Sequence, residues 1–291
     1  MDERSVTMGA MGLHGAPLPL ELACTGAARG LHVSGIQGWY GTPDGKWSLT
    51  ERRTGDGCFQ FAPGQVGYAS RTVTLSAFAL GRDRGDALAL VDSLRRMAHE
   101  RVWLMVTDGG STTAAYDGAL TVEVGEAWFP RTVPVTVTVV FPDPRRYGVP
   151  GHTGTMSVGS ASSQGLRYDD NQCIILPLDY GEVAGSPATC SLANAGTANA
   201  WPVVTLFGYL AAGAVVSCSD GSQIEYSQPV WPVSPVVIDT LSGTAACEGV
   251  DVTRRLARRG MPSVPPGGSM SFSLAATGTG HAEVEFADTY V

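Results

Sequence analysis

The residues that could do chemistry are scattered along the 291-residue chain. Its six cysteines and five histidines lie far apart, with no Cys-x-x-Cys pair and no nearby pair of histidines. Neither a zinc site nor a redox pair is therefore indicated, and free, mostly buried thiols are expected. The hydrolase patterns H-E-x-x-H, G-x-S-x-G and S-x-x-K are missing as well. The sequence favours a protein that is not an enzyme, without a metal or cofactor.

Three short motifs each allow a specific site and also a plainer interpretation. Asp169-Asp170-Asn171 could bind Ca²⁺ through its oxygens if a further ligand came from elsewhere, but a solvated turn is preferred. Arg84-Gly85-Asp86 is the tripeptide that cell-adhesion receptors read, yet it precedes a predicted helix, where glycine and aspartate are expected in the turn and cap. The segment GTPDGKWS at residues 41–48 is one residue short of a P-loop, and no helix pattern follows it.

Composition limits the function classes further. Hydrophobic residues make up 44% of the chain and charged residues only 16%, which indicates a folded protein with much of its surface covered by neighbours. A net charge of −8 disfavours a nucleic-acid binder, because phosphate neutralisation needs a surplus of Lys and Arg. No apolar run of membrane-spanning length and no signal-peptide pattern is found, so synthesis and assembly in the cytoplasm, away from a membrane, are expected.

The elements predicted for the first half are strands and one helix. With 37 glycines and 18 prolines, the chain favours short strands joined by turns. Thr132–Phe141 alternates most clearly between apolar and polar residues, and similar strands are predicted at Arg71–Leu80 and 119–124. The continuous apolar run at 102–106 predicts a fully buried strand. Residues 87–98 place Leu88, Val91, Leu94 and Met97 on one helical stripe, with Asp83 or Asp86 as the cap. We predict a β-sandwich with a single packed α-helix.

A domain boundary is predicted at the segment FPDPRRYG, residues 141–148, where two prolines and a glycine end the strand pattern. The domains are then residues 1–148 and 149–291. No helical period is found in the second domain. Its predicted strands are residues 200–207, 223–226, 236–239, 269–274 and 281–286. A second β-sandwich, and hence a mostly β protein, follows from this pattern.

Two segments are candidate interaction surfaces. Residues 38–59 show no sustained period and read as a long excursion or hairpin that carries Trp39 and Trp47, a residue type enriched at interfaces. The alternative, that these tryptophans cap the local core, has equal weight. The one basic cluster of the second half could meet an acidic partner surface, although a solvated face is the plainer alternative. It consists of Arg254, Arg255, Arg258 and Arg259.

Several fragments, in order along nearly the whole chain, resemble one family. They are GWY at residues 38–40, residues 64–80, the helix at 87–98, FPDPRRYG, Asn194-Ala195-Gly196 before WPVVTLFG at 201–208, VVIDT at 236–240, and Pro265-Pro266-Gly267 before the strand at 269–274. Each fragment is common by itself, and their order and spacing carry the likeness. The sequence resembles the distal tail proteins of siphophages, also called minor tail proteins.

The resemblance implies a structural role in a virion. It implies an N-terminal belt domain that closes a homohexameric ring and a C-terminal galectin-like sandwich outside it. Such a ring joins the tail tube protein to the tail hub protein at the tail tip. Its channel lets the tape measure protein and then DNA pass without specific binding. The residues expected at the ring interface are Trp39, Tyr40, Trp47, Leu88 and Val91.

A carbohydrate-binding module is the alternative function. In this hypothesis the second sandwich presents Trp201 or Trp231 to glycans of the host cell wall. A galectin site, however, needs a His-x-Asn-x-Arg strand and a Trp followed closely by a Glu, and here Trp231 is followed by Pro232-Val233-Ser234. The galectin-like resemblance therefore does not by itself imply sugar binding.

Overall fold

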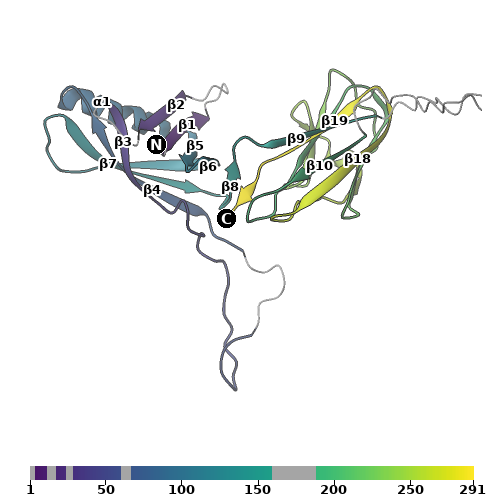
Figure 1. The fold of residues 1–291 in the computed structure, drawn as a ribbon, viewed down its shortest axis with the longest axis horizontal. Helices are drawn as coiled ribbons and strands as arrows, with labels where there is room; N and C mark the ends of the chain where they lie inside the picture. The colour runs from purple at the N-terminus through teal and green to yellow at the C-terminus, as the bar shows by residue number, and fades with distance from the viewer. Residues whose placement is uncertain (1–3, 12–17, 24–28, 60–66, 159–187) are drawn as a thin grey trace, which may run out of the picture. The chain divides into compact units, whose positions relative to one another are not determined.

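The chain folds into two compact β units. The computed structural model describes residues 4–11, 18–23, 29–59, 67–158 and 188–291. The first unit comprises Met1–Pro150 and Thr289–Val291, and the second comprises Gly151–Asp288. The last three residues thus return to the first unit, because β20 (Thr289–Tyr290) pairs with β8 (Arg146–Gly148). The mostly β fold predicted from the sequence is confirmed (Figure 1).

The sheet of the first unit closes on itself. Its other strands are β1 (Ser5–Met11), β2 (Leu18–Ala23), β3 (Gly30–Gln37), β4 (Arg71–Leu80), β5 (Arg101–Asp108), β6 (Ser111–Val124) and β7 (Thr132–Phe141). The order is β20-β8-β6-β5-β1-β2-β3-β4-β7, and β6 also pairs with β7. The first part of β6 bonds to β5 and its second part to β7. Each of β1 to β7 therefore has a neighbour on both sides, and the shortest pairing is that of β2 with β3, which comprises only Leu22–Leu31 and Ala23–His32.

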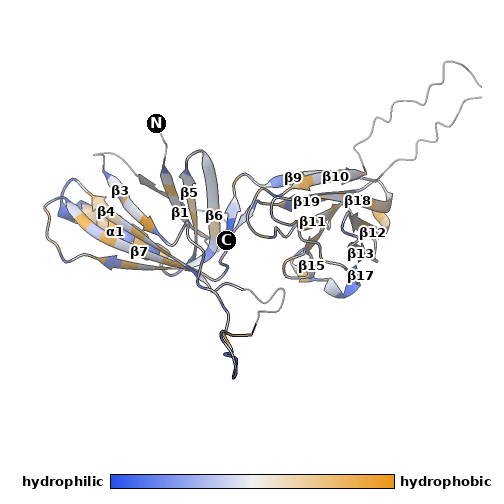
Figure 2. Ribbon diagram, turned by 60° about the horizontal axis from the view of Figure 1, so that its bottom comes forward, coloured by the Kyte–Doolittle hydropathy of each residue, from blue (hydrophilic) through white to orange (hydrophobic). Residues whose placement is uncertain are grey.

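The alternation of the sequence determines which faces are buried. In β7, Val133, Val135, Val137, Val139 and Phe141 are all buried, as the pattern predicted. Helix α1 (Arg84–Met97) begins three residues before the predicted start, and Asp83 caps it by accepting a hydrogen bond from the Asp86 amide. Its buried stripe packs against β4, β6 and β7. Hydrophobic residues of these elements are orange in Figure 2.

The second unit is a sandwich of two antiparallel sheets. One sheet has the order β10-β18-β12-β13-β17 and the other β16-β15-β14-β11-β19-β9. The strands are β9 (His152–Ser157), β10 (Thr189–Ala193), β11 (Val203–Phe207), β12 (Leu210–Cys218), β13 (Gln223–Tyr226), β14 (Val236–Asp239), β15 (Thr244–Cys247), β16 (Val250–Asp251), β17 (Leu256–Arg259), β18 (Ser269–Gly278) and β19 (His281–Phe286), with a 3₁₀ turn, η1, at Thr253–Arg255. The predicted strands at 223–226, 236–239 and 281–286 match β13, β14 and β19.

Candidate interaction surfaces

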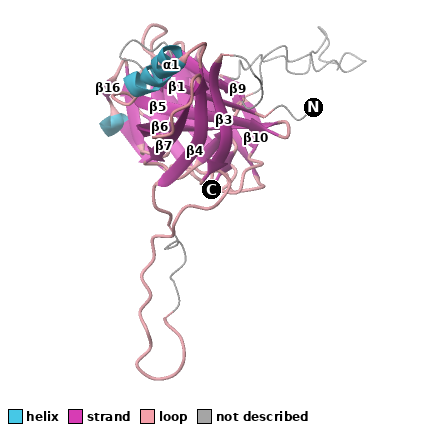
Figure 3. Cartoon of the chain, turned by 90° about the vertical axis from the view of Figure 1, so that its left-hand side faces the viewer, coloured by secondary structure: helices cyan, strands magenta, loops and turns pink. Residues whose placement is uncertain are grey.

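The excursion after β3 is a long two-stranded arm, which we define as residues 38–59 and 67–70 (Figures 1 and 3). Near its base, the Lys46 amide donates to the Gly67 carbonyl and the Ala69 amide to the Asp44 carbonyl, both at 2.7 Å. Further out, the Phe59 amide donates to the Thr50 carbonyl at 3.0 Å. These bonds join residues 44–50 to the returning residues 59 and 67–69, so its own hairpin pairing holds the arm together.

Apolar side chains are exposed along the arm. The exposed fractions are 48% for Trp47, 57% for Leu49 and 62% for Phe59. The Trp47 ring lies directly on Gly45, where an added Cβ would come within 1.7 Å of the ring. Exposed apolar side chains gathered on one projecting segment are typical of a surface that another molecule covers.

The five residues predicted for a ring interface differ in exposure, and their contact with a neighbouring subunit stays a prediction. Trp39 is 1% exposed and Val91 is fully buried, because both side chains belong to the core of the first unit. Leu88 is half-buried and packs against the same core. Tyr40 and Trp47 lie at the surface. For Trp39, the alternative that it caps the local core is therefore the one the structure supports.

A buried arginine anchors the root of the arm. Arg71 is 1% exposed, although it begins strand β4. Its Nη1 donates to the carbonyl oxygens of Gly38 at 2.7 Å, Trp39 at 2.9 Å and Gly41 at 2.8 Å. Its Nε donates to the Pro144 carbonyl at 2.8 Å. One side chain thus fixes both the first residues of the arm and the segment that leads into β8.

Tyr40 joins the arm root to the end of β5. Its hydroxyl donates to Oδ2 of Asp108 at 2.6 Å, and Arg4 Nε lies 2.9 Å from the other carboxylate oxygen. Partial burial of the phenol, and then its bond to Asp108, raise the pKa of Tyr40 to about 12. The hydrogen bonds from Tyr40 and Arg4 lower the pKa of Asp108. Tyr40 is therefore a neutral donor at physiological pH.

A second exposed apolar surface is the loop between β6 and β7, which was not predicted from the sequence. All four residues of Ala127-Trp128-Phe129-Pro130 are exposed, and Trp128 is 84% exposed. The guanidinium carbon of Arg84 lies 4.8 Å from the centre of the Trp128 ring, and Arg84 Nη1 donates to the Phe129 carbonyl at 3.3 Å. Trp and Arg are the residue types most enriched in interface hot spots. Four consecutive apolar residues outside a strand pattern were the signal in the sequence.

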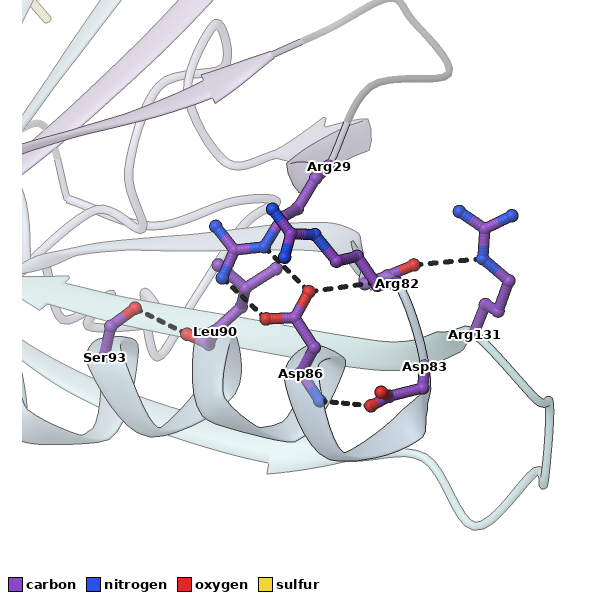
Figure 4. Close-up of polar contacts among 8 residues, drawn as sticks. Arg29, Arg82, Asp83, Asp86, Leu90, Ser93 and Arg131 are labelled. Carbon is purple, nitrogen blue, oxygen red and sulfur yellow. Dashed lines mark hydrogen bonds and ion pairs between the residues drawn. The ribbon is translucent and has the colours of Figure 1, made fainter.

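The tripeptide Arg84-Gly85-Asp86 has a structural role (Figure 4). Arg29 binds the Asp86 carboxylate with two hydrogen bonds of 2.7 Å, and the Arg82 amide donates to it at 2.9 Å. The Asp86 amide in turn donates to Asp83 at 2.8 Å. Asp86 is thus occupied within its own unit and does not present a free carboxylate to a receptor.

The bond between Arg29 and Asp86 predicts a pH effect. It is the largest cause of the lowered pKa of Asp86, followed by the bond from the Arg82 amide. A carboxyl group with a lowered pKa in the folded state stabilises that state above its unfolded pKa of about 4, and this contribution is lost as the pH falls below that value. We expect Arg29→Gln to raise the pKa of Asp86 toward the ordinary range, measured by NMR titration of the side-chain carboxyl. Arg95→Gln, which removes an exposed ion pair with Asp92 on the same helix, is the control and should leave Asp86 unchanged. An unchanged Asp86 titration in Arg29→Gln would contradict the assignment.

The four arginines of the predicted basic cluster are all exposed, on η1 and β17. Arg258 forms an ion pair with Glu225 at 3.1 Å. Arg255 donates to the Tyr226 hydroxyl at 3.3 Å and Arg259 to the Thr253 carbonyl at 3.0 Å. All four arginines thus lie at the surface of this segment, and their contact with a partner remains a prediction.

One exposed aromatic pair lies on the second unit. The rings of Tyr209 and Trp231 are 5.2 Å apart between centres, and Trp231 is 54% exposed. Val233, two residues further on, is 81% exposed. Trp201, the other tryptophan considered for sugar binding, is half-buried.

The remaining candidates do not form a site within the described residues. There, no group of three or more His, Cys, Asp or Glu side chains could hold a metal ion. The described cysteines Cys58, Cys190, Cys218 and Cys247 are free, as predicted, but only Cys218 is buried, and the other three are partly exposed. Cys24, Cys173, His14 and the Asp169-Asp170-Asn171 motif lie outside the described residues. The part of the chain that the structure describes has no helix long and apolar enough to span a membrane.

Comparison with known proteins finds similar folds. The SPP1 Dit protein (gp 19.1), described as a paradigm of the hub adsorption apparatus in phages that infect Gram-positive bacteria, matches with a TM-score of 0.63 and 14% identity over 98% of this chain and 99% of that chain. A chain of the phage P2 baseplate, in its activated conformation with Ca, matches with a TM-score of 0.53 and 10% identity over 97% of this chain and 98% of that chain. The same baseplate with Sr gives a TM-score of 0.51 and 9% identity.

The likeness covers both units but concerns the fold, because the identities are low. No protein-family model and no curated protein matches the sequence. Since each structural match extends over nearly the whole of both chains, the two units occur in the same order in these tail and baseplate proteins. The chain therefore has the fold of the siphophage distal tail proteins that its sequence resembles.

Proposed function

We propose that the protein is a structural component of a phage tail tip, in which copies of the chain form a homohexameric ring between the tail tube and the tail hub. The observation that carries this proposal is the fold shared with SPP1 Dit over 98% of the chain. The exposed apolar segments of the first unit support it, because the subunits of a ring associate through complementary surfaces that their neighbours cover. The arm and the Trp128 loop are such surfaces.

In this proposal, the first unit is the belt domain that lines the channel and the second is the galectin-like outer domain. The tail tube protein and the tail hub protein contact the ring, and the tape measure protein and DNA pass through it. The net charge of −8 suits a passage that DNA crosses without binding. The arm, with Tyr40 at its root and Trp47 near its base, belongs to the contact between neighbouring subunits.

Removing the apolar surface of the arm tests the ring. We expect the triple substitution Trp47→Ser, Leu49→Ser and Phe59→Ser to convert hexamers into monomers, because an interface depends on a few large apolar side chains. Size-exclusion chromatography with light scattering measures the mass, and negative-stain imaging of the unmodified chain should show six-fold rings with a central hole. The matched control, Val233→Ser with Val250→Ser, removes exposed apolar side chains from the second unit and should leave hexamers intact. Intact hexamers in the triple variant would contradict the role of the arm.

A carbohydrate-binding function of the second unit is the second candidate. The exposed pair of Tyr209 and Trp231 favours it, since adjacent aromatic rings offer an apolar face with polar edges. If it is correct, the full chain binds a cell-wall glycan on an array, Trp231→Ala abolishes binding, and Trp128→Ala, which removes an exposed tryptophan from the other unit, does not. Absence of binding by the unmodified chain leaves the structural role alone.

A further inference from the structure

The root of the arm contains buried N–H groups that have no acceptor. Within the described residues, Nη2 of Arg71, Nε of Arg146 and Nε1 of Trp39 are buried without a hydrogen-bond partner. The three side chains are neighbours. Arg71 donates to the Trp39 carbonyl, and the Arg146 guanidinium carbon lies 5.7 Å from the centre of the Trp39 ring. A buried donor without a partner destabilises the folded state, so several of them at one place require an explanation.

Positive charge at the same place is not neutralised. The described residues include no carboxylate paired with Arg71 or Arg146; carbonyl oxygens surround the former, and the rings of Trp39 and Tyr290 contact the latter. Burial, and then the charge of Arg146, lower the pKa of Arg71 to about 10. Burial also lowers the pKa of Arg146. Both guanidinium groups are nevertheless charged at neutral pH, and they repel each other.

Water molecules could accept hydrogen bonds from these N–H groups but would not neutralise the two guanidinium charges. A water molecule offers two lone pairs and no charge, whereas an oxyanion offers several acceptors and also neutralises the repulsion between the two guanidinium groups. Arginine is the residue best suited to planar carboxylate and phosphate groups. Arg146 is only half-buried and the neighbouring Tyr40 is 56% exposed, so a ligand reaches the site from the side of Arg146.

We propose that Arg71, Arg146 and Trp39 form an anion-binding site at the root of the arm, which takes a carboxylate or a comparable oxyanion. Arg71 supplies a fixed, fully buried donor, Arg146 the accessible charge, and Trp39 the indole N–H. The anion comes either from solution or from an Asp or Glu side chain of a second copy of this chain. The site does not depend on the proposed tail function, because it is built from one unit of a single chain.

Thermal unfolding with inorganic phosphate as the probe tests the site. Sodium phosphate is compared with sodium fluoride at equal ionic strength for the unmodified chain, for Arg146→Gln and for Arg101→Gln, which removes an exposed arginine of the same unit. At about ten times the dissociation constant, phosphate should raise the Tm of the unmodified chain and of Arg101→Gln by about 4 °C. Arg146→Gln should show no such rise. Equal rises in all three proteins would overturn the proposal, because they would reflect a general salt effect.

A second measurement is made on the unmodified chain and does not depend on Arg146→Gln folding. Phosphate should shift the indole N–H resonance of Trp39, assigned by its loss in Trp39→Phe, while the other indole signals stay in place. A Trp39 signal that does not move at saturating phosphate overturns the site and leaves water as the acceptor. Light scattering separates the two sources. Phosphate that reduces the mass of an assembled species indicates a carboxylate from a second copy, and an unchanged mass indicates a free anion.

Discussion

Substituting Arg71 by alanine is expected to lower the free energy of unfolding of the first unit by about 3–4 kcal/mol, because several carbonyl groups lose their donor together. The substitution leaves the carbonyls of Gly38, Trp39, Gly41 and Pro144 without their bonds to the guanidinium. It also leaves a cavity beside the buried Trp39 ring. No carboxylate partner is stranded, so the loss stays below that of a broken buried ion pair.

Denaturant unfolding followed by near-ultraviolet circular dichroism measures this effect. Arg101→Ala, whose side chain is 72% exposed, is the matched control and should change the free energy by less than about 0.5 kcal/mol. Arg71→Met keeps most of the volume and thus separates lost packing from lost hydrogen bonds. If Arg71→Ala and Arg101→Ala were equally stable, the carbonyls at the arm root would be satisfied by solvent, and Arg71 would not anchor the arm. Protease cleavage within the arm should also accelerate in Arg71→Ala alone.

Nine of the twenty strands in the described residues were predicted, because in a half-buried strand apolar and polar residues alternate along the sequence. Thr132–Phe141 alternates without a break, and its buried face was identified residue by residue. The bounds of β13, β14 and β19 were equally clear, since turn residues flank short alternating runs. Helix α1 was predicted to begin three residues too late, because its first turn, Arg84 to Asp86, looks like a loop until Asp83 is known to be the cap.

Strand β12 was missed for a physical reason. In Leu210–Cys218 the register shifts between Leu210 and Ala214, so the buried residues do not alternate through the strand. The return of Thr289–Tyr290 to the first unit was missed as well, because a two-residue strand has no period and its partner lies far away in the sequence.

The candidate surfaces were harder to predict than the strands. A tryptophan in an irregular segment has no period that tells inside from outside, so Trp39 and Trp47 looked alike although one is buried and the other exposed. The two tryptophans differ in their contact with Arg71. This arginine lies in β4, 32 residues further along the chain, and binds the backbone around Trp39. A buried arginine at the start of an alternating strand looks like an ordinary surface residue. Side-chain contacts of this kind depend on the tertiary fold and are not encoded in a local pattern.

Gly213→Ala is expected to destabilise the second unit by at least about 3 kcal/mol, through a steric conflict between two strands. Gly213 has φ of +80°, and a Cβ at this position would lie 1.9 Å from the carbonyl oxygen of Tyr226 and 2.9 Å from its carbonyl carbon. That carbonyl belongs to β13, whose Tyr226 is 2% exposed in the core. Relief would require β12 and β13 to separate beside the irregularity in β12, and backbone atoms of a packed sheet cannot move independently.

Gly221→Ala is the control that separates this conflict from backbone strain. Gly221 has nearly the same conformation, φ of +86°, but a Cβ there would meet nothing within 4 Å. Its substitution should therefore cost only about 1 kcal/mol, the ordinary penalty of a left-handed conformation for alanine. The difference between the two variants, measured by denaturant unfolding, isolates the contact with Tyr226. Equal losses would mean that β12 and β13 can move apart freely. In that case Gly213 would be required only for its positive φ, and the close approach of β12 and β13 would contribute little to the stability of the sandwich.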